Sequence, residues 1–127
     1  MDKITEYLSS YATTLKFSDL PLEVVEKTKR VLLDTLGCAL GGYTSEPSKI
    51  ARSMAEVTCA RPATVIGSGQ KTTPDLAAFA NGVMIRYLDY NDIVLSKRGA
   101  GHHSDDIAAV LSPVEVAHGS GRDAITA

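Results

Sequence analysis

The stretch from Leu33 to Leu40 constrains the fold most. It reads LDTLGCAL and is apolar nearly all round, apart from Asp34. A helix that is apolar on almost every side is buried between other elements rather than lying on a surface. We therefore expect a helix over residues 20–40 whose second half is packed between other helices, with Gly37 and Cys38 allowing their close approach.

Apolar residues recur at helical spacing in four further stretches. The five expected helices cover residues 4–15, 20–40, 48–60, 74–88 and 105–118. Gly41 and Gly42 are expected to end the second helix in a left-handed conformation. Pro74 suits the first turn of the fourth helix, whereas Pro113 is expected to kink or break the fifth. The expected core face of the fourth helix is Leu76, Phe79, Ala80, Val83, Met84 and Tyr87.

A short β-branched run with glycines, ATVIGSGQKT at residues 63–72, predicts a strand or hairpin. The fold class is therefore mainly α, a helical bundle-like domain over residues 1–127 with one short hairpin. A chain of 127 residues has room for one domain with a modest core. A sixth helix begins at Arg122 with about one turn, which is unstable alone. We therefore expect the chain to be the front part of a longer protein.

Charge and apolar runs exclude several classes of protein. The formal charge is -2, with 13 basic and 15 acidic residues. The chain therefore lacks the excess of positive charge that binds the phosphate backbone of nucleic acids. Acidic residues near the start do not fit a signal peptide, and no apolar run spans a bilayer. We expect a cytoplasmic protein with no membrane partner. Cys38 and Cys59 have neither a CxxC nor a disulfide-rich spacing, which favours buried free thiols.

Ionisable groups are crowded into RYLDYNDIVLSKRGAGHHSDD at residues 86–106. In the expected layout Asp89 and Asp92 follow the fourth helix, and His102 and His103 precede the fifth. A histidine takes or gives a proton near neutral pH, and a carboxylate bonded to its second nitrogen orients it and raises its basicity. Asp89 and Asp92 are the candidates for that orienting role.

Each of these residues also has a structural interpretation. Asp105 and Asp106 suit helix capping, and Arg86 complements the negative end of a helix dipole. Lys97 and Arg98 fit solvated surface cations, and the histidine pair fits an ordinary loop. The chain has no HxH or HExxH spacing, so we expect no metal site.

Three segments, LLDTLGCALGG, ATVIGSGQKTTPDLAAFANGVMIRYLDYND and GHHSDDIAAVL, resemble the front of the MmgE/PrpD family in order and spacing. The best known members are 2-methylcitrate dehydratases, and related members decarboxylate cis-aconitate. The resemblance implies a mostly helical large domain, a smaller α/β domain and a homodimer or association with a missing C-terminal part. It also implies chemistry on a small tricarboxylate that needs no cofactor.

In that family an LDxND-type segment and an HPSD-type segment line the active site. By this resemblance the catalytic residues are His102, Asp89 and Asp92, and Ser104 and Asp105 follow the histidine. We expect Arg86, Ser104 and Lys97 to bind the substrate.

The chain departs from the family pattern at two positions. Ile93 replaces a common threonine and removes a hydroxyl, and His103 stands where the family usually has proline. Family enzymes are also several times longer, and their later segments supply further catalytic groups. We therefore expect a 2-methylcitrate dehydratase-like lyase that is incomplete in this chain and inactive alone. The alternative is a truncated, non-catalytic helical module or one part of a split enzyme.

Overall fold

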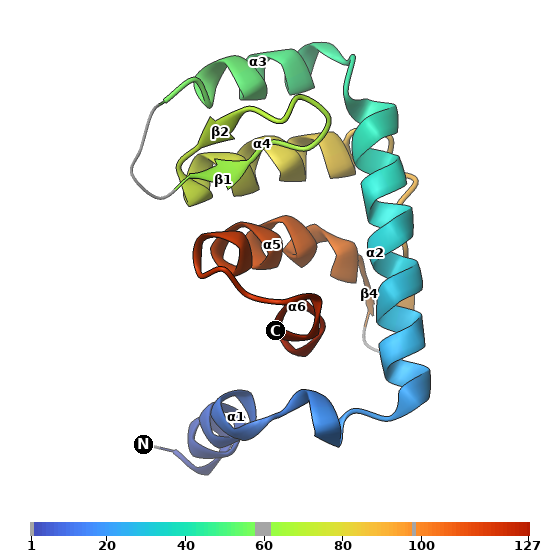
Figure 1. The fold of residues 1–127 in the computed structure, drawn as a ribbon. Coiled ribbons are helices and arrows are strands. Elements are labelled where there is room, and N and C mark those ends of the chain that lie inside the picture. Colours follow the sequence, from blue (N-terminus) through green and yellow to red (C-terminus); the bar gives the residue numbers. More distant parts are fainter. Residues whose placement is uncertain (1, 58–61, 98) are drawn as a thin grey trace.

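The computed structural model describes residues 2–57, 62–97 and 99–127, and they form a mainly α-helical fold (Figure 1). The helices are α1 Lys3–Thr14, α2 Leu22–Gly42, α3 Glu46–Met54, α4 Pro74–Arg86, α5 Ile107–Val116 and α6 Gly121–Thr126, with 3-10 turns η1 Phe17–Asp19 and η2 His103–Asp106. The strands are β1 Ala63–Thr64, β2 Lys71–Thr72, β3 Val94–Ser96 and β4 Gly99–Gly101. The mainly α prediction, with a hairpin near residues 63–72, is confirmed.

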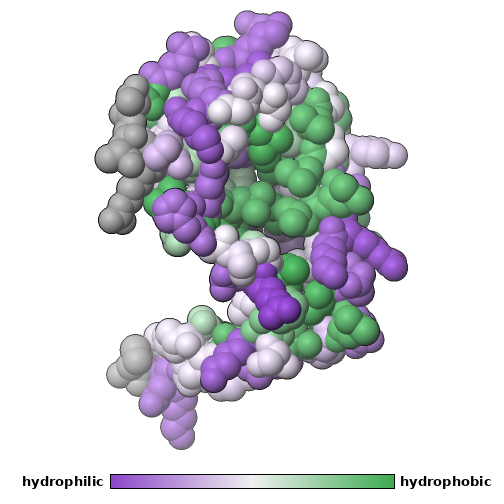
Figure 2. All heavy atoms as spheres, viewed as in Figure 1, coloured by the Kyte–Doolittle hydropathy of each residue, from purple (hydrophilic) through white to green (hydrophobic). Residues whose placement is uncertain are grey.

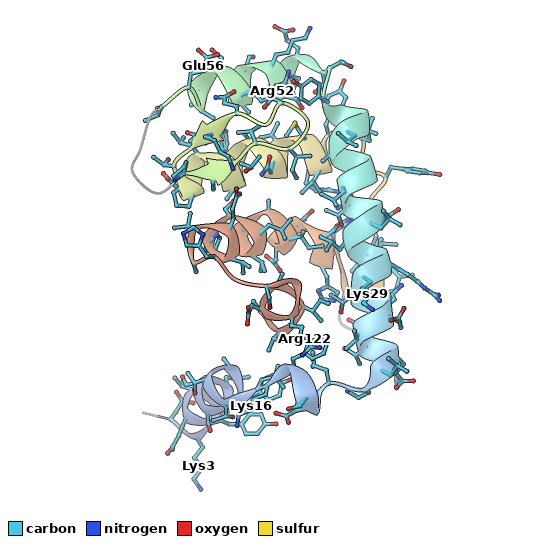
Figure 3. All side chains as sticks on the ribbon, viewed as in Figure 1. Lys3, Lys16, Lys29, Arg52, Glu56 and Arg122 are labelled. Carbon is cyan, nitrogen blue, oxygen red and sulfur yellow. The ribbon has the colours of Figure 1, made fainter. Side chains whose placement is uncertain are left out.

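Helix α2 is the longest element, and the others are arranged along it (Figure 1). Helices α3, α4, α5 and α6 follow one another along the same side of α2, while α1 lies at the opposite end from α3. Helix α4 is central, because it packs against α2, α3 and α5 and also contacts β1. Arg122 links α6 to η1 with its guanidinium 5.3 Å from the ring centroid of Phe17 (Figure 3).

The core is built mainly from small side chains. Its buried residues are Ala39, Ala51, Ala55, Val65, Ala80, Met84, Ile85 and Ala108. Small residues bring helix backbones close together, so a modest number of residues fills the interior at high density. On one side of this core, Arg52 of α3 donates a hydrogen bond to the Tyr43 carbonyl at 2.6 Å and stacks on the Tyr43 ring (Figure 3).

The glycines at the end of α2 serve packing rather than helix termination. Helix α2 continues through Gly42, and Tyr43 after it is still right-handed, so the expected left-handed ending is wrong. A Cβ at Gly42 would lie 2.3 Å from the carbonyl oxygen of Met84. Gly42 therefore lets the backbone of α2 approach the backbone of α4.

The second half of α2 is only partly buried. Cys38, a free thiol, and Ala39 are buried, but Leu33 is 73% exposed and Leu40 is 57% exposed. The expectation of burial from Leu33 to Leu40 is thus wrong for the outer leucines, because neighbours cover only one stripe of α2. Apolar residues are accordingly visible on the surface in Figure 2.

Other differences concern single elements. Phe79 and Tyr87, expected in the core, are exposed, because α4 is covered on the face that carries its alanines and Met84. Helix α3 ends at Met54, which is earlier than expected, and residues 58–60 of the expected helix, with Cys59, lie outside the described residues. Pro113 does not break α5, since Ala117 still donates to the Pro113 carbonyl at 2.9 Å.

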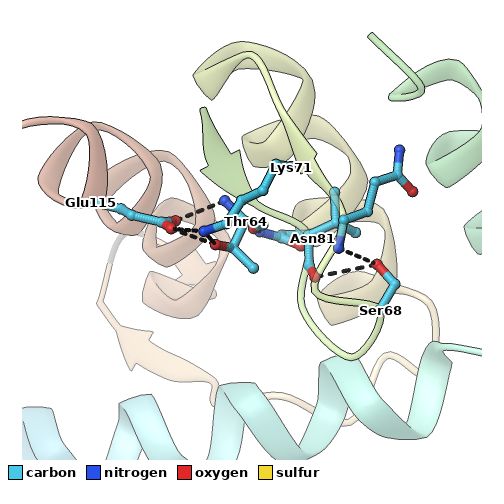
Figure 4. A network of polar contacts seen from close by, with 7 residues as sticks. Thr64, Ser68, Lys71, Asn81 and Glu115 are labelled. Carbon is cyan, nitrogen blue, oxygen red and sulfur yellow. Dashed lines mark hydrogen bonds and ion pairs between the residues drawn. The ribbon is translucent and has the colours of Figure 1, made fainter. Parts of the chain in front are cut away.

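Two polar side chains attach the β1–β2 hairpin to the helices (Figure 4). Asn81 of α4 is buried, donates to the Thr64 carbonyl at 3.0 Å and accepts from the Ile66 amide at 2.8 Å. Glu115 of α5 accepts from the Thr64 amide at 2.7 Å and from the Thr64 hydroxyl, and it pairs with Lys71 at 2.6 Å. The hairpin is therefore held between α4 and α5.

Glu115→Gln is expected to lower the free energy of unfolding by about 1 kcal/mol at pH 7, because a charge-assisted contact becomes a weaker neutral one. Burial alone would raise the pKa of Glu115, but the bonds from Lys71 and Thr64 outweigh it and hold that pKa below its ordinary value. A lowered folded-state pKa gives stability that is present above the unfolded value and is lost as the pH falls through the folded one. Urea unfolding at pH 7 and pH 3 should therefore show the difference between the two proteins shrinking at low pH. A difference that does not change with pH would contradict this role of the charge.

Among the described residues, none of the helices is at once long enough and apolar enough to cross a lipid bilayer.

Candidate functional site

The crowded segment predicted from the sequence connects α4 to α5. Arg86 is the last residue of α4, the β3–β4 hairpin follows, and η2 leads into α5. Helices α4 and α5 pack against each other, so both ends of the connection are fixed to the core. Residues on a connection held by rigid helices are well placed to form a site.

Asp89 has an unusual backbone conformation, with φ 49°. Aspartate tolerates the left-handed region better than most residues, but it is still sparsely populated there. The Asp89 amide donates to the Arg86 carbonyl at 3.0 Å, which turns the chain sharply away from α4. This turn leaves the Asp89 side chain exposed, at the surface of the site.

The guanidinium of Arg86 links the residues that follow α4 to the residues that precede α5. Its Nη1 lies 2.8 Å from Asp89 and donates to the Asn91 side-chain oxygen at 2.9 Å, and its Nε lies 3.4 Å from Asp105. Arg86 thus does more than complement the dipole of its helix. Asp105 takes part in this cluster, and Asp106, directly before α5, makes no side-chain capping bond there.

Asn91 is the residue that the sequence did not single out. Its side chain is buried, and its Nδ2 donates to the Ser104 hydroxyl at 2.7 Å and to Asp105 at 3.1 Å. It therefore holds the segment after α4 to the segment before α5. Its place inside the LDYND segment is a signal that could have drawn attention to it.

Asn91→Ala is expected to destabilise the protein by about 1–3 kcal/mol, because the buried Ser104 hydroxyl and the Arg86 guanidinium each lose a partner. Urea unfolding measures the change. Tyr90→Ala is the matched control, since Tyr90 is adjacent in sequence and 81% exposed. Equal, small effects of both substitutions would contradict the role assigned to Asn91.

His102 is oriented by a main-chain oxygen. Its Nδ1 lies 2.6 Å from the carbonyl oxygen of Asp92. Because a carbonyl oxygen only accepts hydrogen bonds, Nδ1 must carry the hydrogen, and the neutral ring then has its lone pair on Nε2. The structure thus brings His102 to Asp92, but through the backbone rather than through the expected carboxylate.

The Asp92 carboxylate has a different partner. Its Oδ1 accepts from the Ser104 amide at 3.0 Å. Burial by itself would raise the pKa of Asp92, yet hydrogen bonds from Ser104 and from the His103 amide outweigh it and lower that pKa. Asp92 is therefore ionised at neutral pH and fixes the backbone just after His102.

The remaining predicted residues lie in different surroundings. Ser104 is fully buried, so its hydroxyl serves the hydrogen-bond network rather than the surface. Lys97 is exposed at the turn between β3 and β4, and Arg98 lies outside the described residues. His103 and Ile93 are both exposed.

The described residues therefore bring together a cluster of Arg86, Asp89, Asn91, Asp92, His102, Ser104 and Asp105. It offers an oriented imidazole, an arginine and three carboxyl groups. Within the part of the chain that the structure describes, no three His, Cys, Asp or Glu side chains are grouped so as to hold a metal ion. The arrangement suits proton transfer next to an anionic group.

Comparison with known proteins covers nearly the whole chain. The profile of the MmgE/PrpD N-terminal domain matches residues 6–127. A cis-aconitate decarboxylase from Homo sapiens is 32% identical over 114 residues, which make up 88% of this chain and 23% of the relative. A probable 2-methylcitrate dehydratase from Saccharomyces cerevisiae is 33% identical over 87% of this chain and 21% of the relative.

A 2-methylcitrate dehydratase from Salmonella typhimurium is 31% identical over 88% of this chain and 22% of the relative. The chain thus spans about a fifth of the length of the curated relatives it matches. The match over residues 6–127 includes the connection that carries the candidate site. The chain belongs to the MmgE/PrpD family and corresponds to its N-terminal domain.

Proposed function

We propose that this chain supplies part of the active site of a lyase that dehydrates 2-methylcitrate or a closely related tricarboxylate. The observation that carries the proposal is the contact between His102 Nδ1 and the Asp92 carbonyl oxygen, which leaves Nε2 as the proton acceptor. Membership of the MmgE/PrpD family and relatives named 2-methylcitrate dehydratase support the choice of substrate.

The proposed reaction needs a base, an acid and cations. His102 Nε2 takes the proton from the carbon beside a carboxylate, and the electrons form a carbon–carbon double bond. The hydroxyl leaves as water after receiving a proton from an acid of the site that lies outside residues 1–127. Arg86, in the same cluster, is the cation placed to bind a substrate carboxylate. Proton transfer by a positioned side chain contributes about 100- to 10,000-fold to a rate.

The relatives that match this chain extend far beyond the matched segment, so the proposed site includes groups from outside residues 1–127. We propose accordingly that the chain forms the N-terminal part of a longer two-domain, cytoplasmic homodimer, as the family resemblance implies. Asp89 is exposed, so a group of another segment can reach it.

A second candidate is a non-catalytic helical module or one part of a split enzyme. The apolar stripe of α1 favours it: Ile4, Tyr7, Leu8 and Tyr11 are all exposed, and the helix has no buried residue. Exposed apolar surface of this kind is typical of faces that pack against another polypeptide.

A chimera tests the proposal. This chain replaces the matching 114 residues of the Salmonella typhimurium 2-methylcitrate dehydratase, and the product is assayed for loss of water from 2-methylcitrate. We expect turnover by the chimera and none by the 127-residue chain alone. Circular dichroism and gel filtration establish that both proteins are folded.

A folded chimera without turnover would support the non-catalytic module. Turnover that is unchanged by His102→Ala would support the proposed lyase function but contradict the catalytic role of His102. Turnover by the chain alone would contradict the need for groups from outside residues 1–127.

A further inference from the structure

An apolar cavity lies next to the candidate site, between α2, α5 and α6. Its volume is about 440 Å³. The apolar walls are Val31, Leu32, Ile107, Val110, Leu111 and Ile125. Cavities of about 300–1,000 Å³ with mostly apolar walls and a few polar groups are the usual form of small-molecule sites.

The cavity and the candidate site share one segment of chain. Asp92 and His103 both line the cavity, while His102 between them bonds the Asp92 carbonyl. The cavity therefore adjoins the candidate site at Asp92.

The charges around the cavity select what enters it. The lining carries two carboxylates, from Asp92 and Asp106, and one lysine, Lys27 of α2. Asp92 is ionised at neutral pH, and because the carboxylates outnumber the lysine, a further carboxylate brought into the cavity meets net negative charge, which is unfavourable. Uncharged hydrocarbon meets no such penalty and gains from the apolar walls.

We infer that the cavity binds an unbranched alkyl substituent of the substrate, while the carboxylates of the substrate remain outside on the side of Arg86 and His102. The identity of the rest of that substrate rests on the proposed function, whereas the preference for an alkyl chain rests on the cavity alone. The volume exceeds by far the share of about 30 Å³ that one water molecule occupies, so it accepts a chain of several carbons rather than a single methyl group.

Binding of simple alcohols to the 127-residue chain tests the inference without any turnover. The probes are n-butanol, n-hexanol and n-octanol, followed by NMR through the methyl signals of Val110 and Leu111. Each added methylene is expected to tighten binding about fourfold, since burying one is worth about 0.8 kcal/mol. Hexanoate is expected to bind at least about tenfold more weakly than hexanol at pH 7, because of Asp92 and Asp106.

Substitutions locate the binding. Val110→Trp fills the cavity and should abolish octanol binding, whereas Val24→Trp, at an exposed position of α2 outside the cavity, should leave it unchanged. Asp106 is exposed, so Asp106→Asn leaves the fold intact. This substitution should reduce the difference in affinity between hexanol and hexanoate.

Absent binding of octanol, no dependence on chain length, or equal losses from Val110→Trp and Val24→Trp would overturn the inference. If Val110→Trp does not fold, the test is Asp106→Asn. An unchanged ratio of the hexanoate and hexanol dissociation constants in that variant would overturn the inference. If alcohol binding follows the expected series but the chimera is folded and inactive, the proposal of an alkyl-binding cavity stands and the proposed lyase function is rejected.

Discussion

Gly42→Ala is expected to destabilise the protein by about 3 kcal/mol or more, which is the largest effect on stability that we expect from a single methyl group. The added Cβ would lie 2.3 Å from the Met84 carbonyl oxygen and 3.3 Å from the Tyr87 Cβ. The first contact is with backbone, so no side-chain rotation relieves it, and α2 must move away from α4. Replacing a glycine inside a helix by alanine stabilises the helix by only about 0.5–1 kcal/mol, which does not offset the clash.

Gly37→Ala is the matched control for this substitution. Gly37 lies in the same helix. Apart from its chain neighbours and its own helix backbone, no atom of the described residues lies within 4 Å of the position that a Cβ would take, so the close approach expected at Gly37 is not found. Gly37→Ala is expected to stabilise the protein by about 0.5–1 kcal/mol through helix propensity. Urea unfolding of the two variants should therefore give shifts of opposite sign. Stabilisation by both would show that α2 and α4 are not in close contact at Gly42.

His102→Ala is expected to lower kcat of the chimera by about 100- to 10,000-fold, the range that general acid–base groups contribute. The physical reason is the tautomer fixed by the Asp92 carbonyl, which presents Nε2 as a base. His103→Ala is the control, since it removes an adjacent imidazole that does not match the family position, and it should cost less than about tenfold.

The measurement is kcat and KM for 2-methylcitrate. Loss of the base should lower kcat of the folded protein, whereas a purely structural defect would lower the amount of folded protein. Equal, small losses from His102→Ala and His103→Ala would show that His102 is only a loop residue.

Periodicity and turn residues allowed most of the fold to be predicted. Pro74 opens α4 as expected, and the β-branched run at residues 63–72 forms a hairpin. The errors have a common cause. Phe79 and Tyr87 are apolar at helical spacing, and Leu33 lies in a stretch that is apolar nearly all round. All three are exposed, because an apolar pattern shows which sides of a helix are apolar and not whether another element covers them.

The candidate site was predictable in its location and only partly in its contacts. The sequence places Asp92 and His102 ten residues apart, and the structure brings them together. Which atom of Asp92 meets the imidazole depends on the backbone of the connection, and this has no sequence signal. Asn91 escaped notice because an asparagine between two aspartates is typical of an ordinary turn.

The pairing of Arg86 with Asp89 and Asp105 has a consequence for how an anionic ligand would arrive. The guanidinium is already paired with two carboxylates, so a carboxylate of a ligand competes with them for the same cation. Asp89 is the one that can leave, since it is exposed and Asp105 is also bonded to Asn91. Binding of the ligand is then an exchange of carboxylates on Arg86, in which Asp89 dissociates from the guanidinium as the carboxylate of the ligand binds to it.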